Sequence, residues 1–433
     1  MRMPKAEGCS CGKSHKSSVK SVFVGKDALS RLGEELAKIG ARRVFILADV
    51  NTYAAAGERT EAELCRAGIP FSKYVFSEAH LEPDEAAVGK AVIHFDNSAD
   101  TVLAVGSGVI GDIAKIVAAA TGAHYAIVAT APSMDGYASA SSSMIVGGLK
   151  MSVPSMCAEV IIGDTDILKT APDAMLRAGL GDMLAKYISI GEWRIAHIVT
   201  GEYYCEDIAC LMREALARCV ENAEGLLKRE DSAIEAVFEG LVTAGKAMEL
   251  AGVSRPASGV EHYFSHVWDM HALHLGKSVP SHGISCAVGT LLAARMYDVL
   301  RTVTPDASRA KAYAEGFDLK SYHASLLDFL GTGAKTMIAL DEKEQKYSVE
   351  KHAERLGVIL EKWAEILSVI NEEIPSGERI SEILDLIGCP KSPSEIGEDE
   401  GLLPMTFHAT KDIRDKYVLS RLAFDLGIID ELI

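Results

Sequence analysis

The segment TVLAVGSGVIGDIAK, residues 101–115, decides the fold because a strand pattern, a glycine turn and a helix pattern follow one another directly. Its first five residues are typical of a buried strand, and an apolar helical pattern begins at Gly111. Gly106, Gly108 and Gly111 have the GxGxxG spacing that lets a backbone approach a phosphate at a helix N-terminus. A dinucleotide fingerprint usually follows the first strand of its domain, whereas this turn follows the fourth. The segment therefore predicts phosphate binding, with a purely steric role for the glycines as the alternative.

Strands alternate with helices on both sides of this segment. We predict strands over residues 21–25, 43–49, 74–76, 101–105, 125–129 and 160–164. We predict helices between them over residues 27–39, 52–67, 84–94 and 111–120. This alternation indicates a parallel sheet that is covered by helices on both faces. Residues 145–151 interrupt it and predict a hairpin with a Gly-Gly turn.

From Pro172 onward the pattern is helical, apart from residues 374–404, whose four prolines predict a loop or a helix-breaking insert. The predicted fold class is α/β, with a Rossmann-like parallel-sheet N-terminal domain and an all-helical C-terminal domain. The predicted boundaries are a flexible N-terminal tail over 1–18, a dinucleotide-binding domain over 19–168, and a helical metal- and substrate-binding domain over 169–433.

Composition excludes several classes of function. The chain has 433 residues and a net charge of −17, which gives no support for binding to nucleic acid or to a membrane surface. No apolar run approaches the roughly 20 residues of a spanning helix, and the N-terminus lacks the apolar core of a secretory signal. The nine scattered cysteines indicate reduced thiols. We therefore expect a cytoplasmic protein without membrane insertion.

The N-terminus carries one motif of its own, Cys9-Ser10-Cys11-Gly12 followed by His15. Two thiols and an imidazole can bind a metal, but they supply three ligands at most. The alternative is a disordered or loosely docked tail.

Polar side chains are predicted at the carboxyl ends of two strands, where open α/β sheets bind ligands. Asp49 ends the second strand, in the position of an acid that hydrogen-bonds a ribose, or else caps the next helix. Thr130, Ser133, Asp135 and Ser139 follow the fifth strand. Their hydroxyls and carboxylate can contact a ligand, or the loop can simply cap itself.

The segment SGVEHYFSHVWD, residues 258–269, predicts a helix that places His262 and His266 on one face, one turn apart. His282 follows, and Asp182 lies earlier, in GLGDMLAK. A carboxylate and imidazoles with an open position suit Zn²⁺ or a similar ion, which can stabilise an alkoxide while a nicotinamide dinucleotide takes up hydride. The alternatives are hydrogen-bonded or surface histidines and an Asp182 that caps a helix.

Five motifs, taken together and in order, resemble those of the sn-glycerol-1-phosphate dehydrogenases. They are GSGVIGDIAK (106–115), TAPSMDGYAS (130–139), GLGDMLAK (179–186), ASGVEHYFSHVWD (257–269) and SHGISCAVGTL (281–291). That family belongs to a superfamily with the iron-containing alcohol dehydrogenases, the glycerol dehydrogenases and the dehydroquinate synthases. The similarity runs from about Val22 to Tyr417, and the CxCGxxH start is similar to that of bacterial members.

The resemblance implies a Rossmann-like domain and a helical domain with the active site between them. It implies reversible reduction of dihydroxyacetone phosphate to sn-glycerol 1-phosphate by NADH or NADPH, in phospholipid metabolism, by a homodimer. By motif, Asp182, His262 and His282 would be catalytic metal ligands, and Asp135, Asp182 and His266 would contact substrate. The residues implied to line the dinucleotide are Asp49, Gly106, Ser107, Gly108, Val109, Ile110, Thr130, Ser133 and Ser139.

The chain departs from the family pattern at two places. Val109 stands where the family usually has Ser or Thr, and His282-Gly283-Ile284-Ser285-Cys286 stands where superfamily members often have HGEKV. The ligand set suits Zn, Ni or Fe, with Zn preferred. Lys186 and Arg255 are candidates for binding a substrate phosphate. The competing functions are a lyase of the dehydroquinate-synthase kind, a glycerol or other polyol dehydrogenase, and a non-catalytic dinucleotide-binding protein.

Overall fold

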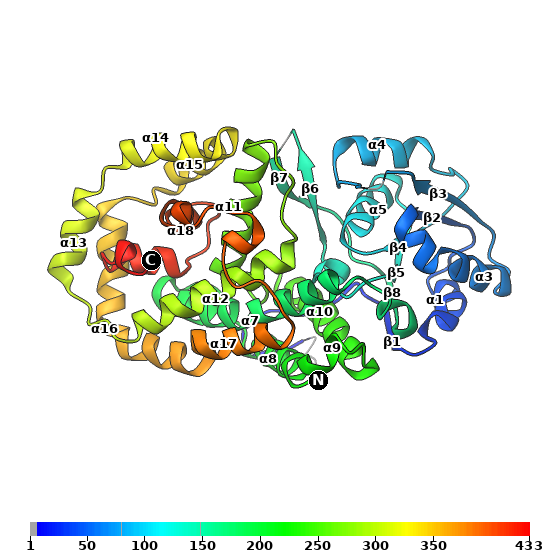
Figure 1. The fold of residues 1–433 in the computed structure, drawn as a ribbon, viewed down its shortest axis with the longest axis horizontal. Coiled ribbons are helices and arrows are strands. Elements are labelled where there is room, and N and C mark those ends of the chain that lie inside the picture. The colour runs from blue at the N-terminus through cyan, green and yellow to red at the C-terminus, as the bar shows by residue number, and fades with distance from the viewer. Residues whose placement is uncertain (1–6, 79, 148) are drawn as a thin grey trace. The chain divides into compact units, whose positions relative to one another are not determined.

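The computed structural model describes residues 7–78, 80–147 and 149–433, and the chain forms two compact units (Figure 1). The first unit contains the residues up to Met183 and Cys210–Val253. The second contains Leu184–Ala209 and Ser254–Ile433. One continuous helix, α7 (Asp173–Thr200), contributes residues to both units.

The first unit is built on a six-stranded sheet in the order β1-β8-β5-β4-β2-β3, in which every pair is parallel. Its strands are β1 (Ser21–Gly25), β2 (Val44–Asp49), β3 (Phe71–Phe76), β4 (Thr101–Gly106), β5 (His124–Ala129) and β8 (Val160–Asp164). The predicted α/β class and all six predicted strands are confirmed. Every residue of β4 is buried, as expected for a central strand of a parallel sheet.

Helices cover both faces of this sheet. The alternate residues Ile46 and Leu103 belong to one core cluster with Leu36 of α1 (Leu32–Lys38) and Leu64 of α3 (Glu58–Arg66). On the other face, α5 (Gly108–Thr121) contacts β4 and β5. A short helix α2 (Val50–Thr52) and a π-helical turn (Tyr53–Gly57) precede α3, and α4 (Glu85–Ile93) follows β3. Helix α5 begins three residues before the predicted start, so the glycine turn shortens to Gly106 and Ser107.

The strand order has a switch point between β2 and β4. The chain leaves β2 for β3 on one side and returns to β4 on the other. Leu47 pairs with Ala104, and continuing that register places Asp49 opposite Gly106. Ligands of open α/β sheets bind outside the carboxyl ends of strands at such a point.

The predicted hairpin is present as β6 (Ser141–Val146) and β7 (Leu149–Pro154), which pair antiparallel. Gly148 of the predicted turn lies outside the described residues.

The three helices that follow α7 are α8 (Glu206–Glu221), α9 (Ala223–Leu226) and α10 (Asp231–Ala251). From Cys210 onward they belong to the same unit as the sheet. A Cβ on Gly163 of β8 would lie 2.2 Å from the ring of Phe238. The absence of a side chain at Gly163 therefore lets α10 pack closely on the strand, and the compact units do not divide at residue 168. The predicted boundaries, as limits of independently folding domains, stay a prediction.

The described part of the predicted tail, residues 7–18, lies against the end of α10. The Ser18 backbone N–H donates to Glu249 at 2.7 Å, and His15 Nδ1 donates to the Leu250 carbonyl at 2.8 Å. His15 is buried. Residues 1–6 of that tail lie outside the described residues.

The second unit is mostly helical. Beyond α7 its helices are α11 (Val260–His274), α12 (His282–Leu300), α13 (Ala307–Gly316), α14 (Leu319–Leu330), α15 (Thr332–Glu344), α16 (Val349–Glu373), α17 (Gly377–Leu386), α18 (Leu403–Thr410) and α19 (Leu419–Asp425). Helix α17 corrects the prediction of a loop or break over 374–404. Its prolines flank the helix, and Ser376 caps its start by accepting the Arg379 N–H.

One helix in the described part of the chain, α12, is long and apolar enough to cross a membrane. Most of its apolar window, 83%, is buried inside the protein, as is usual for a core helix.

Candidate metal and cofactor site

Asp182, His262, His282 and Cys286 each offer one ligand atom, and these four atoms all lie within 4.8 Å of one another. The three predicted ligands are thus brought together with a thiol that the prediction did not include. Asp182 is fully buried and lies inside α7, well past the first turn, so the interpretation of Asp182 as a helix cap is wrong. Its Oδ2 accepts the backbone N–H of Asp135 at 3.0 Å.

The His262 imidazole is oriented by the residue before it. Its Nδ1 lies 2.9 Å from Glu261 Oε1, which also accepts the Gly259 N–H at 2.6 Å. With the Nδ1 proton donated to this carboxylate, Nε2 presents its lone pair. A carboxylate behind a histidine is the usual support of a metal ligand, because it fixes the ring and raises its basicity.

A second buried carboxylate, that of Glu192, lies near Glu261 at the start of α11. Glu192 accepts the Val260 N–H at 2.9 Å and the Leu419 N–H at 2.8 Å. Burial, together with the neighbouring Glu261 carboxylate, raises the pKa of Glu192 to about 8. The raised pKa of Glu192 reflects the cost of placing two buried carboxylates close together.

His282 is the first residue of α12, and its Nδ1 lies 3.2 Å from Ser265 Oγ. One turn further on, Cys286 places its Sγ 3.7 Å from His282 Nε2. Burial would raise the pKa of Cys286, but the His262 and His282 imidazoles outweigh it and lower that pKa. The signal in the sequence was the i, i+4 spacing of His282 and Cys286, the same spacing that drew attention to His262 and His266.

His266 lies beside this group, and its ligand atoms are not among the four. Its ring stacks on that of His282 with centroids 5.9 Å apart, and it is half-buried. The predicted contact of His266 with substrate stays a prediction.

The predicted cofactor residues gather at the carboxyl ends of β4 and β5. Ser107 makes no side-chain cap to α5, and its hydroxyl instead bonds Ser133 Oγ at 2.6 Å and Tyr137 OH at 3.0 Å. The first turn of α5, which contains Gly108, Val109 and Ile110, therefore has backbone N–H groups that its N-cap side chain does not use. A Cβ on Gly106 would lie 2.6 Å from Ile110 Cβ, so close packing requires glycine there.

The loop after β5 is fixed largely by its own contacts. The Thr130 N–H donates to the Gly106 carbonyl at 3.1 Å, and Ser139 Oγ accepts the Ser141 N–H at 3.2 Å. Lys115 Nζ donates to the Gly136 carbonyl at 2.6 Å. These contacts give a pre-formed loop, and its contact with a cofactor stays a prediction.

Asp49 caps α2, as the alternative interpretation predicted. Its Oδ1 accepts the Asn51 and Thr52 N–H groups at 2.8 and 2.9 Å, and Thr52 completes a capping box. The cap holds the carboxylate at the switch point of the sheet. Its predicted contact with a ribose stays a prediction.

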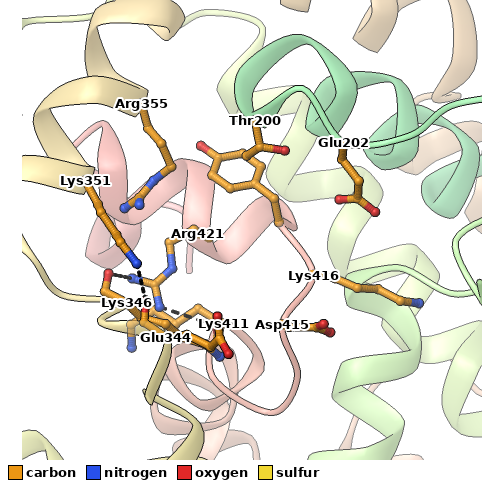
Figure 2. Close-up of a pocket in the computed structure, with 11 residues that line it drawn as sticks. Thr200, Glu202, Glu344, Lys346, Lys351, Arg355, Lys411, Asp415, Lys416 and Arg421 are labelled. Atoms are coloured by element: carbon orange, nitrogen blue, oxygen red, sulfur yellow. Dashed lines mark hydrogen bonds between the residues drawn. The ribbon is translucent and has the colours of Figure 1, made fainter. Parts of the chain in front are cut away.

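A second polar feature lies in the second unit, in a pocket of about 360 Å³ (Figure 2). Basic and acidic side chains line it: Lys346, Lys351, Arg355, Lys411, Lys416 and Arg421, with Glu202, Glu344 and Asp415. Arg355 and Arg421 are paired with the buried carboxylates of Asp425 and Asp412, both at 2.7 Å.

Neither predicted phosphate-binding cation is a simple exposed charge. Arg255 is buried, and its Nε donates to Glu202 Oε1 at 2.7 Å, so a carboxylate already neutralises it. Lys186 is fully buried in α7.

Comparison with known proteins first defines the class. The family described as iron-containing alcohol dehydrogenase matches residues 23–172. The structure of the iron-containing alcohol dehydrogenase from Thermococcus thioreducens superposes with a TM-score of 0.61 at 15% identity, covering 96% of this chain and 99% of that one. The fold is therefore that of the iron-containing alcohol dehydrogenases.

Sequence relatives narrow this class to one family. The chain is 34% identical to the glycerol-1-phosphate dehydrogenase [NAD(P)+] of Halalkalibacterium halodurans over 67% of this chain and 74% of that protein. It is 28% identical to the protein of the same name from Geobacillus thermodenitrificans, over 92% and 90%. The chain belongs to the glycerol-1-phosphate dehydrogenase family and is an oxidoreductase.

Proposed function

We propose that this protein is a metal-dependent, NAD(P)-linked dehydrogenase that interconverts dihydroxyacetone phosphate and sn-glycerol 1-phosphate. The observation that carries the proposal is the group of ligand atoms from Asp182, His262 and His282 within 4.8 Å. The names of the relatives supply the substrate and the cofactor class.

The donor set fits one divalent cation, because a carboxylate and two imidazoles leave a position open for substrate. When bound, such a cation acts as a Lewis acid on the substrate oxygen. The neighbouring thiol of Cys286 favours a borderline-soft cation, so Zn²⁺ is proposed, with Ni²⁺ and Fe²⁺ as the alternatives.

The other roles in the reaction are assigned to residues of the protein itself. Glu261 orients His262, and the Asp135 N–H orients Asp182. His266, stacked on His282, contacts the substrate and exchanges a proton at its hydroxyl. The N-terminus of α5 binds the pyrophosphate, with Gly106–Ile110, Thr130, Ser133 and Ser139 along the dinucleotide. Asp49 bonds the ribose hydroxyls, which favours NADH over NADPH because a carboxylate repels a 2′-phosphate. A cytoplasmic homodimer completes the proposal.

The assay follows NADH absorbance with purified protein loaded with Zn²⁺, Ni²⁺ or Fe²⁺. Dihydroxyacetone phosphate should be reduced with at least one of these metals, and chelation should abolish the rate. Free dihydroxyacetone is the control for the phosphate. Reduction of free dihydroxyacetone but not of its phosphate would refute the proposed substrate and favour a polyol dehydrogenase.

A second arm addresses the lyase alternative. A dehydroquinate-synthase-like enzyme would release inorganic phosphate from a sugar phosphate without net consumption of NADH. Phosphate is therefore measured in parallel, and stoichiometric NADH oxidation without phosphate release supports the dehydrogenase. If NADH reduces neither ketone, the remaining candidates are the lyase and a non-catalytic dinucleotide-binding protein.

A further inference from the structure

A second group of ligand atoms comes from residues to which the proposed function gives no role. Cys9, Cys11, His15 and Cys205 each offer one ligand atom, and the four atoms lie within 4.8 Å of one another. We call these four residues the thiol cluster. Cys9, His15 and Cys205 are buried, and Cys11 is half-buried. Cys205 immediately precedes α8, nearly two hundred positions from the motif in the sequence.

We propose that the thiol cluster is a structural metal site, distinct from the one that contains Asp182, and that it binds Zn²⁺ in a closed S₃N shell. Three thiolates and one imidazole form one of the standard tetrahedral zinc sets, and four protein ligands leave no position for a substrate. The site would fasten the N-terminal segment, and its role would be stability rather than catalysis.

The distances fit this coordination. Cys11 Sγ lies 3.2 Å from His15 Nε2. With Zn–S near 2.3 Å and Zn–N near 2.1 Å, two tetrahedral ligands of these types lie roughly 3.6 Å apart. The pair therefore needs to separate by only a few tenths of an ångström to admit the ion.

The orientation of His15 also fits. Its Nδ1 donates to the Leu250 carbonyl at 2.8 Å, so the Nε2 lone pair is directed at Cys11. A backbone carbonyl that accepts the remote ring N–H is a common support of a metal-binding histidine, because it fixes the tautomer.

The backbone forms a tight turn around the two N-terminal thiols. Gly8 and Gly12 have positive φ angles of 71° and 80°, and the Gly12 N–H donates to the Cys9 carbonyl at 3.0 Å. Only glycine adopts this backbone conformation readily. Both glycines therefore help to fold the segment so that Cys9 and Cys11 can reach one ion.

A hydrophobic core does not explain why this segment is ordered. Residues 7–18 read EGCSCGKSHKSS and contain no Val, Ile, Leu, Met or aromatic side chain. Such a composition buries too little apolar surface to offset the entropy of ordering. Binding of Zn²⁺ by thiolates supplies free energy of the required size in small segments of this kind. None of the nine cysteines, all of which are described, forms a disulfide.

The test measures the metal content of full-length protein after expression with zinc and removal of loosely bound ions. The wild-type protein should retain one zinc in the thiol cluster, in addition to any metal at Asp182. The double variant Cys9→Ser/Cys11→Ser should lose one equivalent, whereas Asp182→Asn should keep it. Cys65→Ser, which removes an exposed cysteine of α3, is the matched control and should change nothing.

Cys205→Ser tests the fourth ligand by itself. Competition with a chromophoric chelator should extract zinc from this variant at least tenfold more readily than from the wild type. Equal zinc retention would show that Cys205 is not a ligand. Full retention in the Cys9/Cys11 double variant would overturn the whole site.

A measurement on the unmodified protein covers the case in which the double variant does not fold. Titration of wild-type thiols with a mercurial should release zinc in proportion to the thiols modified. X-ray absorption of the zinc should report sulfur ligands beside nitrogen and oxygen, because any zinc at Asp182 contributes its own shell to the average. A zinc shell of nitrogen and oxygen alone would refute the proposal. Neither result depends on dehydrogenase activity, so failure of the proposed function and failure of this site are distinguishable.

Discussion

Glu261 is the side chain that orients His262, the proposed metal ligand. It is fully buried, one carboxylate oxygen contacts His262, and Oε2 has no hydrogen-bond partner among the described residues. Burying a carboxylate with one unpaired oxygen lowers the stability of the fold. We therefore attribute the presence of Glu261 to its support of a metal-binding histidine. The exchange Glu261→Gln keeps the shape and removes the charge.

We therefore expect Glu261→Gln to weaken metal binding by about 10–100-fold, the usual effect of losing an outer carboxylate. The metal-free protein should be no less stable than the wild type in urea. Glu224→Gln, at an exposed ion pair with Lys228, is the control and should alter neither quantity. Unchanged metal affinity in Glu261→Gln would show that the carboxylate only supports the backbone at Gly259.

His262 and His266 differ in what their removal should change. His262→Ala should lose the metal bound at Asp182 and all turnover. His266→Ala should retain the metal, and its kcat should fall by roughly 10²–10⁴-fold if it transfers a proton at the substrate. Metal analysis and steady-state kinetics of both variants check this. Loss of metal from His266→Ala would make it a ligand and would overturn the proposed division.

Side chains close together in the sequence were the predictable ones. His262 and His266 share a helix face, and their spacing alone drew attention to them. Cys205 could not be predicted as a neighbour of Cys9, because no local pattern records a contact across so long a separation. In the sequence, Cys286 stands out only as a departure from the family pattern. Because α12 begins at His282, the i, i+4 spacing places Cys286 one helical turn from that histidine.

At the scale of elements, the crossing of α11 and α12 positions the two histidines. The helices touch where α12 has Gly289, and a Cβ there would lie 2.6 Å from the Glu261 carbonyl oxygen. Because that oxygen belongs to the backbone, it cannot move aside as a flexible side chain would.

We expect Gly289→Ala to separate the helices, to destabilise the protein by about 1–3 kcal/mol, and to weaken metal binding together with stability. Urea unfolding and metal titration measure the two effects. Gly357→Ala is the matched control, since a Cβ added at that exposed glycine of α16 would meet no described atom of another part of the chain within 4 Å. This control should gain about 0.5–1 kcal/mol from helix propensity. Wild-type behaviour of Gly289→Ala would contradict the role of this crossing.

Elements were predictable where the pattern was local and regular. The six strands are apolar runs flanked by turn residues, and all were found. The helix α17 was missed because four prolines dominate its neighbourhood, although Ser376 is a good cap. Packing between elements was not predictable: the fit of Phe238 over Gly163, which holds α10 on the sheet, needs two positions far apart in the sequence.

At the scale of the whole molecule, the balance of buried charges in the second unit makes stability depend on pH. Lys411 is buried, its Nζ donates to the His408 carbonyl at 2.9 Å, and it lies 3.3 Å from the Asp412 carboxylate. Its Nζ also lies 3.8 Å from the ring centroid of Tyr322. Burial, only partly offset by Asp412, lowers the pKa of Lys411 to about 8.

In the unfolded chain the pKa of a lysine is about 10.4. Between pH 8 and pH 10.4 the unfolded state therefore binds more protons at this site than the folded state does, so the site's contribution to the free energy of unfolding rises with pH. Below pH 8 both states are protonated and the folded state bears the full cost of a buried charge. From pH 7 to pH 9.5 the difference amounts to about 2 kcal/mol.

The variant Lys411→Met removes this titration. The free energy of unfolding in urea should therefore rise by about 2 kcal/mol more for the wild type than for the variant over that interval. Lys228→Met, at an exposed lysine, should follow the wild type. Parallel pH profiles for wild type and Lys411→Met would show that Lys411 keeps an ordinary pKa in the folded protein, and that the Asp412 carboxylate fully compensates its burial.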